Sequence, residues 1–343
     1  MKIDFSAYLK KSVQEIEQEL VLFSQAWNDE IAKRLPALKK LNENLTDGFS
    51  GGKMLRGTLV KLGYELVTEE STKAILQPAA AFEILHTAFL IHDDIIDESL
   101  TRRGKPTMHI QNGKGHYGIA QAICQGDLGF TLATKLITES NFPENRKTRA
   151  LAIFLQNKVD TILGEMLDIE PPEKRDEKLV NDIHLLKTAN YTIVGPMTVG
   201  AIFGGADNLF LRKVKQFGEP LGLAFQIQDD ILGIYGDEKY IGKSTTSDIE
   251  EDKTTLLLTY SLENGTKTQK EILQEYYGKR EITKTQQEII KKVFEETGAL
   301  SYSQKKIENL INEAKTFIPS LTSDANKQAL LQQLCDLLLK RKD

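Results

Sequence analysis

Apolar residues recur every three or four positions over most of the chain. The pattern is clear at Leu9, Val13, Ile16 and Leu20, and again at Ile289, Ile290, Val293 and Phe294. This spacing places apolar side chains on one face of an α-helix. Only nine prolines occur in 343 residues, and none lies between Leu221 and Ile318, so long helices are possible. The pattern predicts an all-α protein.

No linker rich in Ser, Pro or Gly divides the chain, and its composition does not shift. We therefore expect one domain over residues 1–343, folded as a large helical bundle around a central cavity. Forty per cent of the residues are apolar, which suffices for a core without disulfides or a structural metal. Cys124 and Cys335 are then expected to be two small apolar residues of a reduced, cytoplasmic protein.

Two segments have some features of export or membrane sequences. Residues 1–25 mix charged with apolar positions, so we expect a helix and not a signal peptide. Residues 188–206 are uncharged, but Gly195 and Pro196 interrupt them, which predicts a kinked, buried helix and no integral membrane segment. A net charge of −5 without a basic stripe excludes a general affinity for nucleic acid.

Two acidic motifs follow apolar runs, HDDIID at His92–Asp97 and QDDILG at Gln228–Gly233. Asp93 and Asp97 are four residues apart, so both carboxylates project from one face of a helix. Oxygen ligands alone favour Mg²⁺ or Mn²⁺ over zinc. Magnesium completes its octahedron with water and substrate phosphates, so the motif indicates a diphosphate substrate.

A single Asp-Asp pair is more often part of a solvated helix face. Two such motifs beside apolar runs favour metal binding, because crowded carboxylates repel each other by several kcal/mol unless cations neutralise them. Basic residues supply the complement: Arg102 and Arg103 follow the first motif, and Lys53 and Arg56 precede it in a Gly-Gly-Lys segment. That segment lacks the spacing of a nucleotide P-loop. The clusters suggest two phosphorylated ligands, one held through metal and one held directly by cations.

Six motifs then occur in a fixed order. They are GGKxxR at 51–56, HTAFLIHDDIID at 86–97, RRGKPT at 102–107, KTA at 187–189, FQIQDD at 225–230 and GKxxxSDxxxxKTTL at 242–256. With them the chain resembles the trans-isoprenyl diphosphate synthases of the polyprenyl synthetase family. The resemblance covers a motif core of about 51–258 and implies the isoprenoid synthase fold and a homodimer. Residues 265–343 carry only amphipathic patterns, which we expect to serve packing or dimerisation.

The resemblance also implies an activity and its residues. Isopentenyl diphosphate would be added to an allylic diphosphate, one five-carbon unit per cycle, with about three Mg²⁺ ions or possible Mn²⁺. The implied metal ligands are Asp93, Asp97 and Asp229, with Asp94 and Asp230 as further candidates. The implied isopentenyl diphosphate site is Lys53, Arg56, His86 and Arg103. The implied allylic diphosphate site is Arg102, Lys187, Thr188, Gln226, Lys243 and Lys253, of which Lys187, Thr188 and Gln226 also act in catalysis.

Product length should depend on the pocket before the first motif, for which we expect Leu85, Ala88 and Phe89. Ala88, five positions before Asp93, leaves room where short-chain enzymes often carry an aromatic ring, whereas Phe89 narrows the channel. This favours geranylgeranyl diphosphate slightly over farnesyl diphosphate and leaves a longer polyprenyl product open.

Three other functions share parts of this pattern. A class I terpene synthase normally carries NDxxSxxxE as its second motif, a head-to-head condensing enzyme lacks the paired basic motifs, and a non-catalytic subunit typically loses the aspartates. The chain departs from the commonest family pattern at Gly57, where proline is usual, and at Gly233, which replaces a third aspartate. We expect activity to survive both departures.

Overall fold

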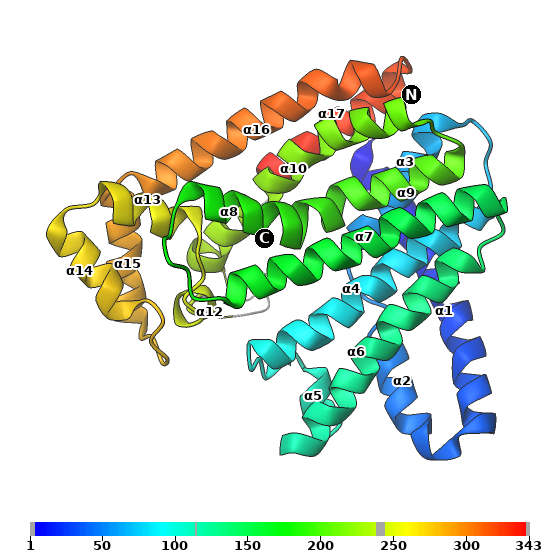
Figure 1. Cartoon of the computed structure of the whole chain (residues 1–343), viewed down its shortest axis with the longest axis horizontal. Helices are drawn as coiled ribbons and strands as arrows, with labels where there is room; N and C mark the ends of the chain where they lie inside the picture. Colours follow the sequence, from blue (N-terminus) through cyan, green and yellow to red (C-terminus); the bar gives the residue numbers. More distant parts are fainter. Residues whose placement is uncertain (1–3, 114, 238–243, 341–343) are drawn as a thin grey trace. The chain divides into compact units, whose positions relative to one another are not determined.

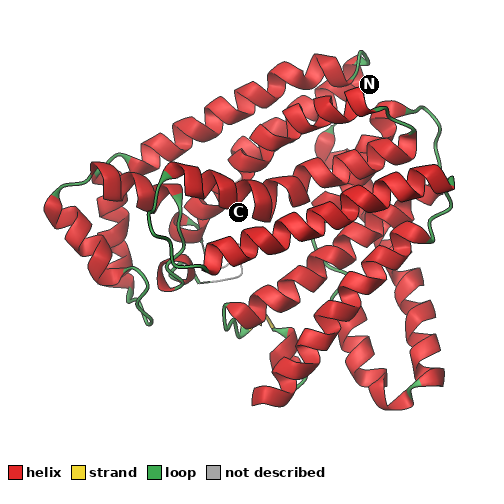
Figure 2. Cartoon of the chain, in the orientation of Figure 1, coloured by secondary structure: helices red, strands yellow, loops and turns green. Residues whose placement is uncertain are grey.

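A computed structural model describes residues 4–113, 115–237 and 244–340. Nearly all of this part is helical, which confirms the all-α prediction (Figure 2). The α-helices are α1 (Phe5–Arg34), α2 (Lys39–Asp47), α3 (Leu55–Val67), α4 (Leu76–Ile96), α5 (Met108–Gln111), α6 (Gly115–Thr138), α7 (Glu144–Ile169), α8 (Glu177–Ile183), α9 (Gly195–Gly204), α10 (Asn208–Tyr235), α12 (Ser247–Glu250), α13 (Leu256–Asn264), α14 (Lys267–Tyr276), α15 (Lys284–Glu296), α16 (Ala299–Leu321) and α17 (Ala325–Lys340). The remaining elements are the 3₁₀ helices η1 (Pro36–Leu38) and η2 (Lys73–Ile75), the π-helix η3 (His184–Val194), and the strands β1 (Thr101–Arg102) and β2 (Lys105–Pro106).

The chain forms two compact units. The first comprises Met1–Gln156 and Gly195–Arg212, and the second comprises Asn157–Val194 and Lys213–Asp343. The helices α7 and α10 contribute residues to both units. The expectation of one domain over residues 1–343, with a central cavity, stays a prediction.

Helix α4 is the centre of the first unit, where it packs against α1, α3, α6 and α9, with α6 alongside it (Figure 1). Its buried Phe82 meets Phe154 edge to face at 5.0 Å. Helices α3 and α9 pack closely because both carry glycine at the contact. A Cβ on Gly63 would lie 2.2 Å from the Met197 carbonyl oxygen, and one on Gly200 would lie 1.9 Å from the Val60 carbonyl oxygen. Side chains at these positions would force the helices apart.

One segment, Lys73–Ile96, is long and apolar enough to cross a membrane by length and composition alone. Since 67% of its most apolar window is buried inside the protein, it is a core helix and no membrane span. The stretch 188–206 is also buried for the most part, as expected, and its helix type changes at Gly195. Proline at position 196 has no N–H to donate, which fits a break in the helical hydrogen-bond ladder there.

The second unit is built around α16, which packs against α13, α15 and α17. Apolar side chains from the C-terminal helices fill its core, among them Leu273, Phe294, Ile307 and Leu334. Helices α14 and α15 begin with capping boxes, in which Thr266 pairs with Gln269 and Thr283 with Gln286. The amphipathic patterns after residue 265 therefore serve packing within this unit.

The two cysteines differ. Cys335 is buried, and burial raises its pKa to about 12. Cys124 is exposed on α6, unlike Cys335. It lies on the outward face of an amphipathic helix, where sequence spacing alone did not place it. Neither thiol forms a disulfide.

Candidate active site

The first acidic motif ends α4. Asp93 and Asp94 lie in its last turn, and Asp97 is its C-cap residue. The Arg102 guanidinium donates from Nε to Asp94 Oδ1 at 2.6 Å and from a terminal nitrogen to Asp93 Oδ2 at 3.1 Å. Only 6% of the Asp94 side chain is exposed. Burial raises the pKa of Asp94 and the Arg102 charge opposes that rise, so the ion pair keeps a buried carboxylate in its charged form.

Arg102 and Arg103 belong to a tight hairpin. Strands β1 and β2 are antiparallel, and the two residues between them, Arg103 and Gly104, have φ of 53° and 72°. Two consecutive positive φ values are typical of a type I′ turn. Arg103 donates to the Gly51 carbonyl oxygen at 2.9 Å, while Arg102 binds the aspartates of α4. The turn thus sends neighbouring guanidiniums to two different anion-binding clusters.

Two of the predicted isopentenyl diphosphate residues, Arg56 and His86, lie near Arg103. The pKa of His86 is held well below its ordinary value, first by burial and then by the charges of Arg56, Arg103 and Arg102. His86 is therefore a neutral hydrogen-bonding group among cations. Lys53 is exposed in the loop before α3. The structure brings Arg56, His86 and Arg103 together, as expected from their motifs.

Glu83 is a member of this cluster that sequence reasoning missed. Its Oε1 accepts the backbone N–H of Gly57 at 2.6 Å, and its side chain is buried. Burial raises the pKa of Glu83, while the Gly57 N–H and the charges of Arg56 and Arg103 lower it. The available signal was that Glu83 is the one Asp, Glu, Lys or Arg in the mostly apolar run 76–91, one helical turn before His86.

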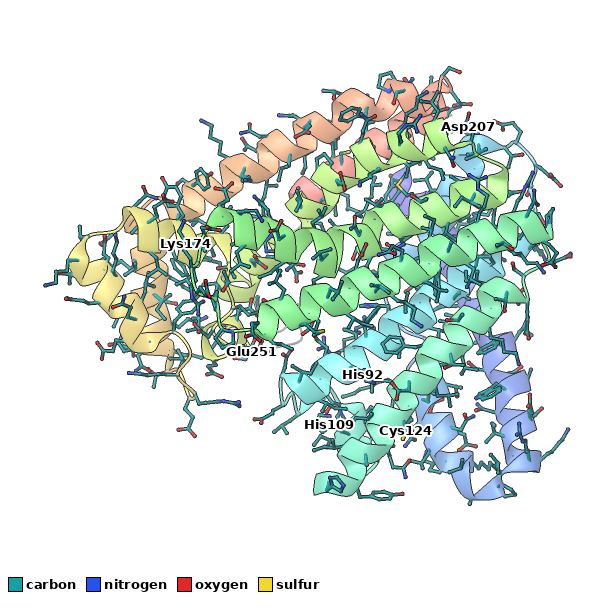
Figure 3. The ribbon with its side chains drawn as sticks, viewed as in Figure 1. His92, His109, Cys124, Lys174, Asp207 and Glu251 are labelled. Atoms are coloured by element: carbon teal, nitrogen blue, oxygen red, sulfur yellow. The ribbon has the colours of Figure 1, made fainter. Side chains whose placement is uncertain are left out.

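His92, which opens the first motif, has a structural role. Its ring lies between α4 and α6, 5.2 Å from the Phe130 ring, and its Nε2 is 3.2 Å from the Ile123 carbonyl oxygen (Figure 3). A Cβ on Gly126 would lie 2.2 Å from this nitrogen, so glycine makes room for the ring.

In the second unit, the second acidic motif belongs to a chain of polar contacts. Thr188 Oγ1 donates to Gln226 Oε1 at 2.7 Å, and Gln226 Nε2 donates to Asp230 Oδ1 at 2.8 Å. His184 Nε2 lies 3.0 Å from Asp230 Oδ2. Asp229, next to it on α10, is partly exposed. The structure thus brings Thr188, Gln226 and Asp230 together, and His184 is a contact that the sequence did not reveal.

Lys187 is fixed by two carboxylates of α7 that sequence reasoning also missed. Its Nζ lies 2.8 Å from Glu165 Oε2 and 2.8 Å from Asp168 Oδ2. Burial alone would raise the pKa of Asp168, but Lys187 and Lys253 bring it below its ordinary value. Both predicted lysines therefore lie near one carboxylate. The two ammonium groups and their carboxylate partners form one cluster of ion pairs within this unit.

Close backbone packing holds Lys187 and its neighbours in place. A Cβ on Gly164 of α7 would lie 2.4 Å from the Lys187 nitrogen, and one on Gly222 of α10 would lie 2.5 Å from Ala189 Cβ. The π-helical segment that carries Lys187 and Thr188 is thus enclosed by two glycine contacts. Such segments are frequent at functional sites.

At position 233, where glycine replaces the third aspartate of the second motif, another residue fills the space that a side chain would need. A Cβ on Gly233 would lie 2.0 Å from Asp248 Oδ2, so the carboxylate of Asp248 occupies the space into which a side chain at 233 would project. Lys253 Nζ lies 3.4 Å from the other oxygen of Asp248 and 2.8 Å from Glu251. The predicted residue Lys243 lies outside the described residues.

The three residues expected to set product length lie on α4. Leu85 and Ala88 are fully buried, and a Cβ on Gly129 of α6 would lie 2.9 Å from Ala88 Cβ. Phe89 packs edge to face on Phe130 at 4.8 Å. Ala88 therefore faces a tight helix contact, and an aromatic ring at that position would separate α4 from α6. The role of these residues in product length stays a prediction.

The carboxylates suit a hard cation. Asp93 and Asp94 offer only oxygen donors and already bind the positive charge of Arg102. Among the described residues, no three His, Cys, Asp or Glu side chains are gathered to hold a metal ion by themselves. Magnesium needs no such cage, because substrate phosphates and water can complete its octahedron.

Comparison with known proteins agrees with these features. Residues 38–297 match the family model described as polyprenyl synthetase. The chain is 34% identical to geranylgeranyl diphosphate synthase of Sulfolobus acidocaldarius, covering 67% of this chain and 69% of the relative. It is 31% identical to a short chain isoprenyl diphosphate synthase of Methanothermobacter thermautotrophicus, covering 85% and 87%.

Solved structures show the same likeness. The crystal structure of geranylgeranyl pyrophosphate synthase from Corynebacterium glutamicum, complexed with isoprenyl diphosphate and magnesium, matches with a TM-score of 0.90 and 26% identity. The match covers 99% of this chain and 100% of that one. The fold is thus the all-α isoprenoid synthase fold. With ordered motifs, fold and family model in agreement, the chain belongs to the polyprenyl synthetase family.

Proposed function

We propose that the protein is a trans-prenyltransferase that condenses isopentenyl diphosphate with an allylic diphosphate. The observation that carries this proposal is the hairpin turn at Arg102 and Arg103. One guanidinium donates to the carboxylates of the first acidic motif, and the next donates to the Gly51 carbonyl oxygen and lies near Arg56 and His86. An enzyme that joins two diphosphate substrates needs two such clusters, one for a metal-bound and one for a metal-free diphosphate.

The allylic diphosphate belongs with the metal ions. Asp93, Asp97 and Asp229 are the proposed ligands for about three Mg²⁺ or Mn²⁺ ions, with Asp94 and Asp230 as further candidates. When bound, Mg²⁺ neutralises the charge that develops on the departing diphosphate. Arg102, Lys187 and Lys253 contact phosphate oxygens in this proposal. Lys187 is suited to this work because Glu165 and Asp168 fix its ammonium group at 2.8 Å.

The reaction breaks the bond between the allylic carbon and the diphosphate oxygen. The double bond of isopentenyl diphosphate then forms a new carbon–carbon bond to that allylic carbon, and a proton leaves, with the departing diphosphate as its acceptor. The Thr188 carbonyl and the Gln226 amide stabilise the positive charge on carbon as oriented dipoles. The hydrogen bond between the two side chains, 2.7 Å long, holds them in a fixed relation.

Isopentenyl diphosphate is held without metal. Arg56 and Arg103 bind its phosphates, Lys53 adds a charge from the loop before α3, and His86 donates a hydrogen bond as a neutral ring. The low pKa of His86, which burial and the surrounding guanidiniums cause, supports the neutral form. Arginine suits this task because its planar fork matches phosphate oxygens.

We further propose a C20 product. The relatives from S. acidocaldarius and C. glutamicum are both named geranylgeranyl diphosphate synthases. The test is to incubate the purified protein and Mg²⁺ with labelled isopentenyl diphosphate and dimethylallyl, geranyl or farnesyl diphosphate, then chromatograph the dephosphorylated alcohols. Geranylgeraniol is expected. Farnesol or a longer alcohol would refute the C20 product, and no use of isopentenyl diphosphate would refute the prenyltransferase proposal.

A homodimer in the cytoplasm completes the proposal. Exposed apolar side chains form a stripe along α7 in the second unit, at Val159, Ile162, Leu163, Met166 and Ile169. A second copy of the chain would remove this stripe from water. Light scattering should give a dimer mass for the wild type and a monomer mass for Leu163→Glu. A monomeric wild type would exclude the dimer, and a membrane-bound pool after cell fractionation would exclude the cytoplasmic location.

A further inference from the structure

Helix α3, which carries Arg56, begins without a capping side chain of its own. Its N-cap residue Met54 has a φ of 44° and makes no side-chain hydrogen bond to the helix. The first N–H groups of a helix need acceptors from elsewhere. Glu83 of α4 supplies one, because its Oε1 accepts the Gly57 N–H at 2.6 Å. A carboxylate at this end of a helix is also favoured by the helix dipole.

The same carboxylate is the negative partner of the cationic cluster. Burial and the charge of Arg102 lower the pKa of Arg103, whereas Glu83 raises it. In turn, the charges of Arg56 and Arg103 oppose the rise that burial causes in the pKa of Glu83. Glu83 thus lies close to both guanidiniums. Without it, the mutual repulsion of the arginines would go uncompensated.

This contact between α3 and α4 depends on glycine at position 57. A Cβ at this position would lie 2.9 Å from the Ala79 carbonyl oxygen and 3.0 Å from Ile16 Cδ1, so a side chain has no room. Proline, the residue that this position commonly carries in the family, would in addition have no N–H for Glu83. The departure at Gly57 therefore supplies both the close contact of α3 with α4 and the donor that orients the carboxylate.

We propose that Glu83 is a positioning residue for isopentenyl diphosphate. It fixes the start of α3, and with it Arg56, and it holds the Arg103 guanidinium so that both arginines meet the metal-free diphosphate with their N–H donors already oriented. Glu83 itself touches neither substrate nor metal. This inference rests on the proposed function, since it concerns the second of the two diphosphate sites.

The test is steady-state kinetics of Glu83→Gln, which keeps the size of the side chain and an acceptor for Gly57 but removes the charge. The KM for isopentenyl diphosphate should rise about tenfold or more, as expected when a charge-assisted contact is lost. The KM for the allylic substrate and kcat should stay within about twofold, since no bond-breaking group is touched. A KM for isopentenyl diphosphate that is unchanged or lower than that of the wild type would overturn the proposal.

A matched control is Glu65→Gln. Glu65 lies on α3, accepts the Tyr8 hydroxyl at 2.7 Å and pairs with Lys61 at 3.5 Å, away from the arginine cluster. The same substitution there should leave both KM values unchanged, and a matching rise in the KM for isopentenyl diphosphate would show a general structural effect and overturn the assignment.

A double-mutant comparison separates positioning from stability. If Glu83 acts through Arg103, the effects of Glu83→Gln and Arg103→Ala on the KM for isopentenyl diphosphate should be less than additive. Full additivity would contradict the mechanism. If Glu83→Gln does not fold, Glu83→Asp replaces it: this variant keeps the charge on a shorter side chain that no longer reaches the Gly57 N–H, so the same KM should rise above that of the wild type, and an unchanged KM would overturn the proposal. A wild-type protein that uses no isopentenyl diphosphate would instead refute the proposed function.

Discussion

Replacing Arg102 by glutamine would remove the guanidinium that Asp93 and Asp94 share. The bond to Asp94 dominates, because only 6% of that side chain is exposed and the Nε to Oδ1 distance is 2.6 Å. The Asp93 side chain is 25% exposed, so water screens its pair and we expect less than about 1 kcal/mol from it. A buried charged hydrogen bond contributes about 1.5–3 kcal/mol. Proton uptake by Asp94, from an ordinary aspartate pKa of about 3.9, limits the total loss at pH 7 to about 4 kcal/mol.

We therefore expect Arg102→Gln to lower the free energy of unfolding by about 3 kcal/mol in metal-free buffer. For a unit of this size the melting temperature should fall by roughly 6–12 °C. Magnesium alone, without a phosphate group that Arg102 could contact, should restore more of that loss in the variant than it adds to the wild type. In the variant the bound cation no longer competes with a guanidinium for the carboxylates.

Thermal unfolding of both proteins, in EDTA and in Mg²⁺ alone, measures this difference. Arg149→Gln is the matched control, because Arg149 donates to the Ala206 carbonyl oxygen at 3.0 Å in the same unit and contacts no aspartate of the motif. The control should be destabilised equally with and without metal. Equal metal-dependent gains for wild type and Arg102→Gln would refute the reasoning that Arg102 occupies the cation position of the first motif.

Three further outcomes follow from the site. Asp93→Ala or Asp229→Ala should leave less than about a tenth of wild-type turnover in saturating Mg²⁺ while circular dichroism stays unchanged, because each variant lacks a metal ligand; higher activity would exclude direct ligation. Arg103→Ala should raise the KM for isopentenyl diphosphate far more than that for the allylic substrate, and Lys187→Ala should do the reverse; equal effects on both constants would end the division into two sites. Because His86 is buried with a pKa held well below its ordinary value, the unfolded chain binds a proton at about pH 6.5 that the folded chain does not, so stability falls as the pH drops. Between about pH 7.5 and 5.5 the melting temperature of His86→Gln should fall less than that of the wild type, and parallel curves would exclude His86 as a source of acid sensitivity.

Helix content could be predicted from the sequence because it depends on local spacing, and the candidate ligand groups were proposed from local spacing too. The i, i+4 relation of Asp93 and Asp97 and the pair Arg102-Arg103 are visible in the printed chain. The direction that each arginine takes was not visible, because it depends on positive φ at Arg103 and Gly104. The sequence shows where the two arginines stand in the chain, whereas the backbone conformation of the turn determines which groups their guanidiniums contact.

The partners missed were those that only tertiary packing brings close. Glu165 and Asp168 of α7 contact Lys187 of the neighbouring helix η3. This contact depends on Gly164, because the absence of a side chain there lets α7 pack closely against η3. Glu83 is 26 residues from the Gly57 N–H that it accepts. Ala88 packs against Gly129 of α6, a contact that spacing along α4 did not predict. The spacing of residues along one helix does not predict contacts with residues on another helix.

Calorimetric titration of the metal-free protein with isopentenyl diphosphate tests most directly whether two chemically different diphosphate sites exist. In EDTA, isopentenyl diphosphate should bind the wild type and Asp93→Ala alike, and Arg103→Ala should weaken the binding about tenfold or more, because the site uses guanidiniums and no metal. Farnesyl diphosphate should bind tightly only when Mg²⁺ is present. Loss of isopentenyl diphosphate binding in EDTA, or its weakening in Asp93→Ala but not in Arg103→Ala, would contradict the two-site account.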